Sequence, residues 1–306
     1  CSSDLSFPVG KVNTIQMYPM TFTEFIIARG KNLMAELLEN KDWQTLSTLH
    51  DVLIQMLREY YMVGGMPEAV NVFIETNDAN SVREVQREIL LAYKNDISKH
   101  TTKEQSHRIA MVWNSMPSQL SKENKKFLYG VVKKGGRAKE FELAIQWLID
   151  AGLIIKVGRI TTPSMPLKVY EDLSAFKLYL LDVGLLGAMA EINPVQLLLP
   201  NDMKESKGMF TENFVCTQLV TQFNSSLFYY SKENSTLEID FFVQKETQII
   251  PIEVKAELNV KSKSLSTILQ NNEEMFGVRF SMNQYRQQEK IVNLPLYCAE
   301  VYFKED

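Results

Sequence analysis

The sequence predicts an α+β fold in several domains: a helical N-terminal part, a helix-rich middle part that ends in strands, and a C-terminal α/β part with a mixed sheet. Three observations support this. The 306 residues are 45% hydrophobic and 23% charged, which is enough chain and enough apolar surface for two or three cores. Helical periodicity dominates the first hundred residues, and period-two alternation dominates the last eighty. We place the boundaries at 1–100, 101–190 and 200–306.

The N-terminal part contains three apolar patterns with helical spacing. We expect helices from Thr21 or Thr23 to Gly30, from Trp43 to Met62, and from Ser81 to His100. Between the second and third, Gly64-Gly65 predicts a sharp turn, and Pro67 followed by Glu68 predicts a helix start.

The middle part has the order helix, turn, helix, strand, loop, strand, which is typical of a winged helix. The predicted helices and strands are Ile109–Met116, Lys122–Val132, Arg137–Ala151, Leu153–Val157 and Leu167–Tyr170. A Met-Pro-Ser turn separates the first two helices, and Gly152 ends the third.

Charge is concentrated in this middle part. The whole chain has a net charge of −4, but residues 99–168 hold 13 Lys and Arg against 5 Asp and Glu. Such a local excess suits phosphate contacts, so DNA is the expected partner, and docking of a protein is the open alternative. The cations that we expect at the entrance and outer face of the third helix and in the wing are Lys133, Lys134, Arg137, Lys139 and Arg159.

The C-terminal part contains a predicted hairpin with charges on one face. Its strands are Glu238–Val243 and Ile249–Lys255, with a five-residue break between them, so residues that sum to about 492 or 493 face each other. Asp240 then lies near Glu253, with Lys255 beside them. Two carboxylates and an ammonium could hold a divalent cation against a phosphate. The alternative is a solvated edge whose ions pair across the hairpin.

Other predicted elements surround this hairpin. A helix over Met209–Phe223 carries Glu212, a strand covers Leu227–Ser231, a helix covers Ser262–Met275, and a strand covers Val278–Ser281. The order is therefore helix, three strands, helix, strand.

This order and these residues resemble the PD-(D/E)XK, or restriction-endonuclease-like, superfamily. There the first helix supplies a Glu, the second strand an Asp, and the third strand a Glu-x-Lys triplet. The resemblance implies that Glu212, Asp240, Glu253 and Lys255 are catalytic. Asp240 and Glu253 would bind Mg²⁺ or Mn²⁺, and Lys255 would orient or help to deprotonate the attacking water.

One further residue supports the match, and two depart from it. Gln218 resembles a helix position that recurs in part of the superfamily. Ile239 stands where the family motif has a proline. Pro251 is unusual inside a paired strand and indicates an edge or an unpaired backbone position.

The chain as a whole resembles the C-terminal region of prokaryotic AAA-type ATP-binding proteins. The segments that carry this resemblance, together with the nuclease-like tail, are Phe7–Val12, Tyr18–Phe25, Gly64–Val70 and Lys177–Leu186. The family places a P-loop ATPase domain upstream, then a helical lid, a winged helix and a PD-(D/E)XK-like domain. This sequence has no Gly-x-x-x-x-Gly-Lys-[Ser/Thr], so we expect ATP binding only in a full-length protein and no ATPase activity in this chain.

We therefore expect the effector part of an AAA-type ATPase, which binds DNA and cleaves it with Mg²⁺ or Mn²⁺. The alternative is a non-catalytic DNA- or protein-binding assembly module with a degenerate nuclease fold. Either kind of protein is compatible with a homo-oligomer. The first residue is Cys1 and not Met, which indicates a fragment or a processed product. No apolar run approaches the ~20 residues of a membrane span, no signal peptide is visible, and three scattered cysteines suit a reducing compartment. We expect a cytoplasmic protein.

Overall fold

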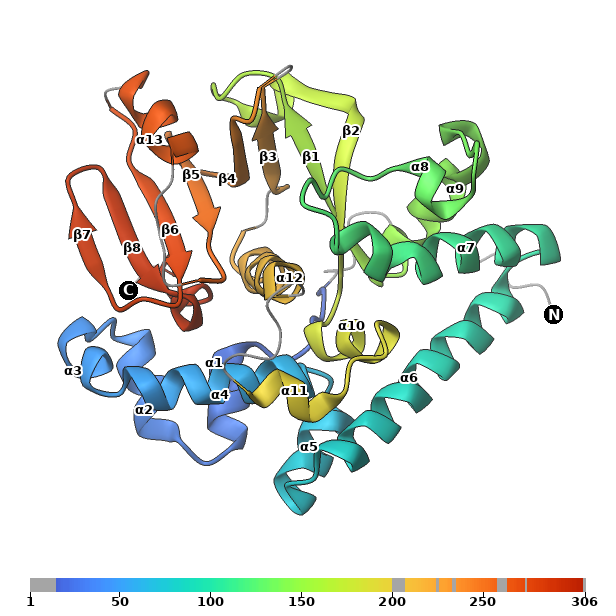
Figure 1. The fold of residues 1–306 in the computed structure, drawn as a ribbon, viewed down its shortest axis with the longest axis horizontal. Coiled ribbons are helices and arrows are strands. Elements are labelled where there is room, and N and C mark those ends of the chain that lie inside the picture. The colour runs from blue at the N-terminus through green and yellow to red at the C-terminus, as the bar shows by residue number, and fades with distance from the viewer. Residues whose placement is uncertain are drawn as a thin grey trace.

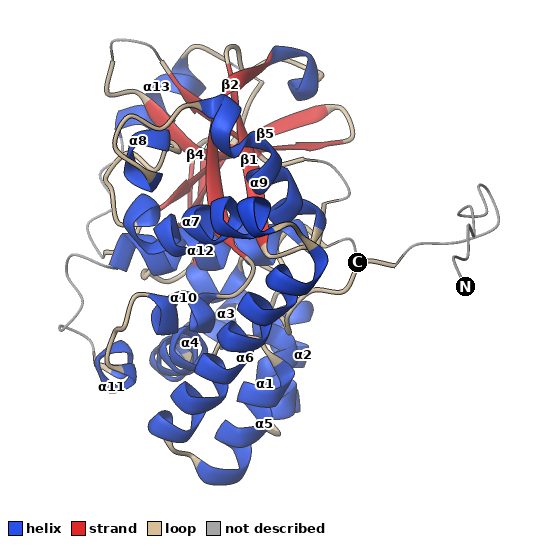
Figure 2. Ribbon diagram, turned by 90° about the vertical axis from the view of Figure 1, so that its right-hand side faces the viewer, coloured by secondary structure: helices blue, strands red, loops and turns tan. Residues whose placement is uncertain are grey.

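A computed structural model describes residues 15–199, 207–223, 226–232, 235–257, 263–272 and 274–304. The fold is α+β, and one mixed sheet of eight strands lies beside a large group of helices (Figure 1). Seen from the side, the N-terminal helices fill one half of the molecule and the strands the other (Figure 2). None of the described helices is both long enough and apolar enough to cross a bilayer.

The N-terminal half is helical, as predicted, but one predicted helix is divided in two and the helix Asn32–Glu39 was not predicted. Thr21 caps the first helix in a capping box with Glu24, in which each side chain accepts from the other residue's N–H. The predicted helix from Trp43 to Met62 is two helices, which meet at Leu49. The helices of this half are α1 (Phe22–Ala28), α2 (Asn32–Glu39), α3 (Trp43–Thr48), α4 (His50–Val63), α5 (Pro67–Thr76) and α6 (Ala79–His100).

The glycine pair makes the predicted turn. Gly64 has φ of 75°, and the Gly65 N–H donates to Asp182 Oδ2 at 2.6 Å. Pro67 is the first residue of α5, as expected. The turn therefore places the start of α5 against Asp182, the residue that caps α10 (Val183–Met189).

Three predictions for the middle part are wrong. Pro117 does not separate two helices, because it lies in the last turn of α7 (Lys103–Leu120). Residues 122–128 form bends and one isolated bridge at Lys126, and only α8 (Tyr129–Val132) is helical. The Phe127 N–H donates to Phe176 O at 2.8 Å, so pairing with a strand overrides local helical preference. The second strand begins after a 3-10 helix, η1 (Leu167–Tyr170), and is β2 (Glu171–Leu180).

The third helix and the first strand of the middle part were predicted correctly. They are α9 (Ala138–Asp150) and β1 (Ile154–Ile160). Because β1 extends to Ile160, Arg159 lies in this strand and pairs with Asp172 of β2, and not in the loop that the sequence predicts after Val157.

The C-terminal part follows the predicted order of helix, three strands, helix and strand, with a further hairpin at its end that the sequence did not reveal. Ser262 and the segment Phe7–Val12 lie outside the described residues. The elements after α10 are α11 (Pro194–Leu198), α12 (Lys207–Val220), β3 (Phe228–Ser231), β4 (Glu238–Lys245), β5 (Gln248–Val254), α13 (Lys263–Gln270), β6 (Gly277–Ser281), β7 (Arg286–Gln288), β8 (Ile291–Pro295) and η2 (Leu296–Cys298).

The sheet crosses from the middle part into the C-terminal part. The strand order is β2-β1-β3-β4-β5-β6-β8-β7, and β1 pairs with β3 in parallel through Gly158 and Phe228. Both parts therefore contribute strands to one sheet, which puts side chains of β2 within reach of β4. The division at about residue 190–200 stays a prediction.

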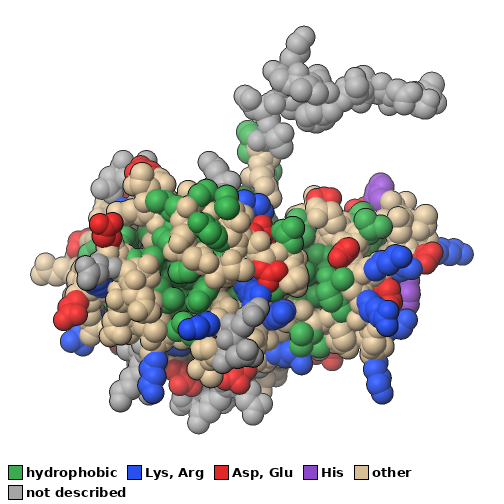
Figure 3. Space-filling model, turned by 90° about the horizontal axis from the view of Figure 1, so that it is seen from above, with side chains coloured by type: hydrophobic (Ala, Val, Ile, Leu, Met, Phe, Trp, Pro, Cys, Tyr) green, Lys and Arg blue, Asp and Glu red, His purple; other side chains and the backbone are tan. Residues whose placement is uncertain are grey.

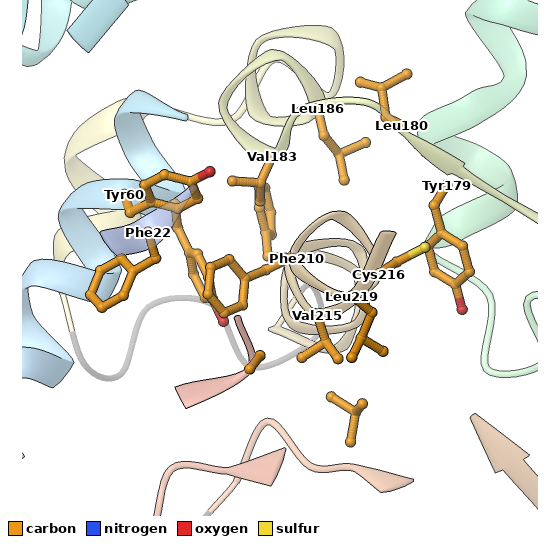
Figure 4. Close-up of a cluster of buried hydrophobic side chains, with 14 of the residues drawn as sticks. Phe22, Tyr60, Tyr179, Leu180, Val183, Leu186, Phe210, Val215, Cys216 and Leu219 are labelled. Atoms are coloured by element: carbon orange, nitrogen blue, oxygen red, sulfur yellow. The ribbon is translucent and has the colours of Figure 1, made fainter. Parts of the chain in front are cut away.

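Helix α12 joins the two halves. Phe214, Val215, Cys216 and Leu219 are fully buried, and polar residues of the same helix are buried as well, so the helix is enclosed on nearly all sides. Figure 4 shows Phe22 and Tyr60 on one side of it, Tyr179 on the other, and Val215 and Leu219 pointing away from both. This burial fixes the position of Glu212, which the same helix carries.

Candidate functional site

The β4–β5 hairpin has the predicted register. Phe241 pairs with Ile252 and Val243 with Ile250, so each pair sums to 493, and the same register continued by one residue sets Asp240 opposite Glu253, whose charge acts on it. Asp240 Oδ2 also accepts from the Val254 N–H at 2.8 Å. The hairpin therefore brings the two carboxylates together as expected.

Glu212 reaches this patch from α12, and both of its carboxylate oxygens have partners. Lys125 Nζ lies 2.6 Å from Oε1, and the Tyr179 hydroxyl donates to Oε2 at 3.2 Å. Lys125 lies in the segment between α7 and α8, and Tyr179 lies on β2. The middle part of the chain thus supplies both partners of Glu212.

Glu253 is also held through both oxygens. Lys255 Nζ lies 3.0 Å from Oε1, and Arg279 Nε, from β6, lies 3.4 Å from Oε2. The side chains of Glu253 and Arg279 are each 5% exposed, whereas that of Lys255 is 35% exposed. Lys255 is therefore the part of this group that solvent reaches most easily.

Lys177 is the most deeply buried charge of the cluster. It lies on β2, its side chain is 1% exposed, and its Nζ lies 2.5 Å from Glu238 Oε1. The same Nζ lies 4.8 Å from the ring centroid of Tyr229, within the range of a cation–π contact. Glu238 shares one face of β4 with Asp240, so Lys177 lies against the acidic face of the hairpin.

These charges perturb one another. Burial, reinforced by the charge of Glu212, raises the pKa of Asp240 to about 7. Burial alone would lower the pKa of Lys177, but Glu212, Glu238 and Asp240 together raise it. Burial opposes ionisation of Glu212, but Lys125 and Lys177 hold its pKa below the ordinary value. Likewise, Glu253 and Asp240 raise the pKa of Lys255 against the effect of burial.

The cluster is balanced in charge. We call it the charged cluster; its carboxylates and cations are Glu212, Glu238, Asp240 and Glu253, and Lys125, Lys177, Lys255 and Arg279. Within the described part of the chain, no three His, Cys, Asp or Glu side chains are placed to hold a metal ion together. Both oxygens of Glu253, one of the two expected metal ligands, already contact cations. The residues in this arrangement therefore do not fit Mg²⁺ or Mn²⁺.

Four of the five predicted nucleic-acid contacts are on the surface. Lys133, Lys134, Arg137 and Lys139 are exposed, at the entrance and start of α9. Figure 3 shows Lys and Arg side chains gathered at the end of the molecule that carries α7, α8 and α9 in Figure 1. Arg159 is different, because its Nε and Nη2 both donate to Asp172 Oδ2, at 2.9 and 2.5 Å. Its charge is thus already paired within the sheet.

Sequence reasoning missed the roles of Lys125, Lys177, Tyr179 and Arg279. One signal was present: Lys177 lies in a run of five residues that is otherwise apolar or aromatic, from Phe176 to Leu180. A lone lysine in such a strand needs a buried counter-charge. Gln218, in contrast, anchors α1, since its Oε1 accepts from the Phe22 N–H at 2.9 Å.

The charged cluster bridges two regions that match known protein domains. Residues 54–196 match a domain of unknown function (DUF8612), and residues 207–299 match another (DUF4143). The second is found at the C-terminus of AAA-ATPase-like proteins. Neither the curated proteins nor the solved structures contain a match to this chain. Lys125 and Lys177 lie in the first region, as does Tyr179, and the other six members of the cluster lie in the second.

Proposed function

We propose that this chain is a nucleic-acid-binding effector module of an AAA-type ATPase, and that its nuclease-like acidic site does not cleave. The observation that carries the second part is the charge balance of the cluster. Catalysis with a divalent metal needs carboxylate oxygens that are free to bind it. Here Glu212 and Glu253 use both oxygens within the protein.

The binding surface that we propose is the group of four exposed cations before and within the first turn of α9. None of the four side chains pairs with a carboxylate of the described residues, whereas Lys125, Lys177 and Arg159 are all neutralised internally. Exposed cations in this position would contact phosphates without reading bases. In a winged helix the corresponding helix faces the duplex.

Salt dependence tests this surface. The chain and a variant with glutamine at positions 133, 134, 137 and 139 are titrated into a labelled duplex at several salt concentrations, and anisotropy is followed. If each cation contacts one phosphate, the negative slope of log K against log salt becomes less steep by about 3.6 in the variant. A variant with glutamine at Lys31 and Lys41, which lie away from α9, serves as control and keeps the wild-type slope. An unchanged slope in the fourfold variant would refute the assignment.

A second candidate, metal-dependent cleavage, is favoured by one observation. Asp240 and Lys255 are only partly buried, and the charge of Glu212 adds to burial in raising the pKa of Asp240, a shift that a bound cation would oppose. Nicking of plasmid that requires Mg²⁺ or Mn²⁺, and that both Asp240→Ala and Lys255→Ala abolish, would establish cleavage.

A further inference from the structure

The charged cluster draws its charges unequally from the two matched regions. The region 207–299 contributes four carboxylates but only two cations, Lys255 and Arg279, which leaves two negative charges. The region 54–196 contributes only two charges, and both are positive: Lys125 and Lys177. The region 54–196 thus supplies two positive charges, as many as one divalent cation carries, to the region 207–299.

Backbone pairing holds Lys177 directly, and Lys125 through its neighbour Lys126. Lys177 is in register with Val157 of β1, and an isolated bridge pairs Lys126 with Lys177. The segment before α8 is therefore tied to β2, and Lys125 lies at the end of that tie. With side chains 7% and 1% exposed, neither ammonium could stay charged without its carboxylate partner.

The two lysines differ in how easily they could leave. Lys177 belongs to a long strand with an extended register against β1, whereas Lys125 lies in a segment outside any helix or strand. That segment leads directly into α8 and then into the exposed cations of residues 133–139. A polyanion on those cations would contact the part of the chain that also positions Lys125.

We propose that Lys125 and Lys177 take the place of a divalent cation in the nuclease-like site and thereby exclude a metal from it. They form a built-in inhibitory contact, which the region 54–196 makes on the region 207–299. This proposal rests on the proposed nuclease-like nature of the site. It adds a means of regulation, since removal of the two positive charges would release one oxygen each of Glu212 and Glu238 beside Asp240, while Glu253 stays paired with Lys255 and Arg279.

Metal-dependent thermal unfolding of the whole chain tests the proposal. The wild type is expected to unfold at the same temperature with and without Mn²⁺. The double variant Lys125→Met/Lys177→Met keeps the side-chain volume and loses both charges, so Mn²⁺ at 100 times its Kd would raise its Tm by about 4 °C. Adding Asp240→Asn to the double variant should remove that increase. Lys125→Arg/Lys177→Arg keeps both charges, so its Tm is expected to be the same with and without Mn²⁺.

Two results would overturn the proposal: an increase in wild-type Tm with Mn²⁺ that equals that of the double variant, or no increase in a folded double variant. If the double variant does not fold, Lys125→Met alone is judged by the same criterion. Duplex binding by the wild type is measured separately, as described above. A failure of nucleic-acid binding is therefore distinguishable from a failure of the lysine contact.

Discussion

Lys177→Met is the substitution that tests the charge balance most simply. Methionine fills a similar volume and leaves the backbone pairing of β2 untouched, so the change removes one charge and little else. In the wild type, Lys177 Nζ lies 2.5 Å from Glu238 Oε1 and also interacts with Glu212 and Asp240. The variant therefore leaves an excess negative charge among three carboxylates.

The expected cost follows from burial. Removing one partner of a buried ion pair costs 3–5 kcal/mol, because the other charge stays buried without compensation. The Glu238 side chain is 26% exposed, so water can reach it and the cost should lie near the lower limit, about 3 kcal/mol. For a chain of this length, that corresponds to a decrease in Tm of about 5 °C.

Urea unfolding followed by circular dichroism gives the free energy, and Lys177→Met/Glu238→Gln completes a double-mutant cycle. We expect the double variant to regain part of the loss, with a coupling of about 1–3 kcal/mol between the two sites. A loss below about 1 kcal/mol for Lys177→Met, or no coupling with Glu238, would refute the view that this lysine neutralises the site.

Two further predictions concern the junction between α4, α5 and α10. Gly64→Ala should destabilise the chain by about 3 kcal/mol in urea unfolding, because the residue has φ of 75° and a Cβ would lie 2.3 Å from Asp182 Oδ1. Gly30→Ala, with φ of 71° but open space around it, is the matched control and should cost about 1 kcal/mol; equal losses would contradict the steric argument. Burial raises the pKa of Asp182 to about 6, above the ~3.9 of an unfolded aspartate, so its contribution to stability is full below pH ~4 and lost as pH rises to ~6. Relative to Asp182→Asn, the wild type should lose about 3 kcal/mol between pH 4 and 7, and a constant difference between the two proteins would contradict this pKa.

The local patterns predicted most of what depends on one element or one hairpin. Thr21, Pro67 and the alternation of Glu238 to Val243 each specify a local structure, and the structure has all three. The register that pairs Asp240 with Glu253 follows from loop length alone. Such features depend on capping, fixed φ and period two, which a sequence displays directly.

What depended on contacts between distant segments could not be predicted. Phe127 pairs with Phe176 and pulls residues 122–128 out of a helical pattern, and β1 pairs with β3 across an interval of about seventy residues. The same long-range pairing brings Lys125 and Lys177 to Glu212 and Glu238. Spacing within the C-terminal motif shows its carboxylates, but the counter-charges come from another part of the chain.

We propose that these counter-charges hold a nuclease-like site in a non-cleaving state while the chain binds nucleic acid. One gel tests it: supercoiled plasmid is incubated with the wild-type chain and Mn²⁺, then run with and without removal of the protein. We expect retarded plasmid before the protein is removed and fully supercoiled plasmid afterwards. Nicked or linear plasmid that forms only with Mn²⁺, and that does not form with Lys255→Ala, would show that the site cleaves and would contradict this proposal.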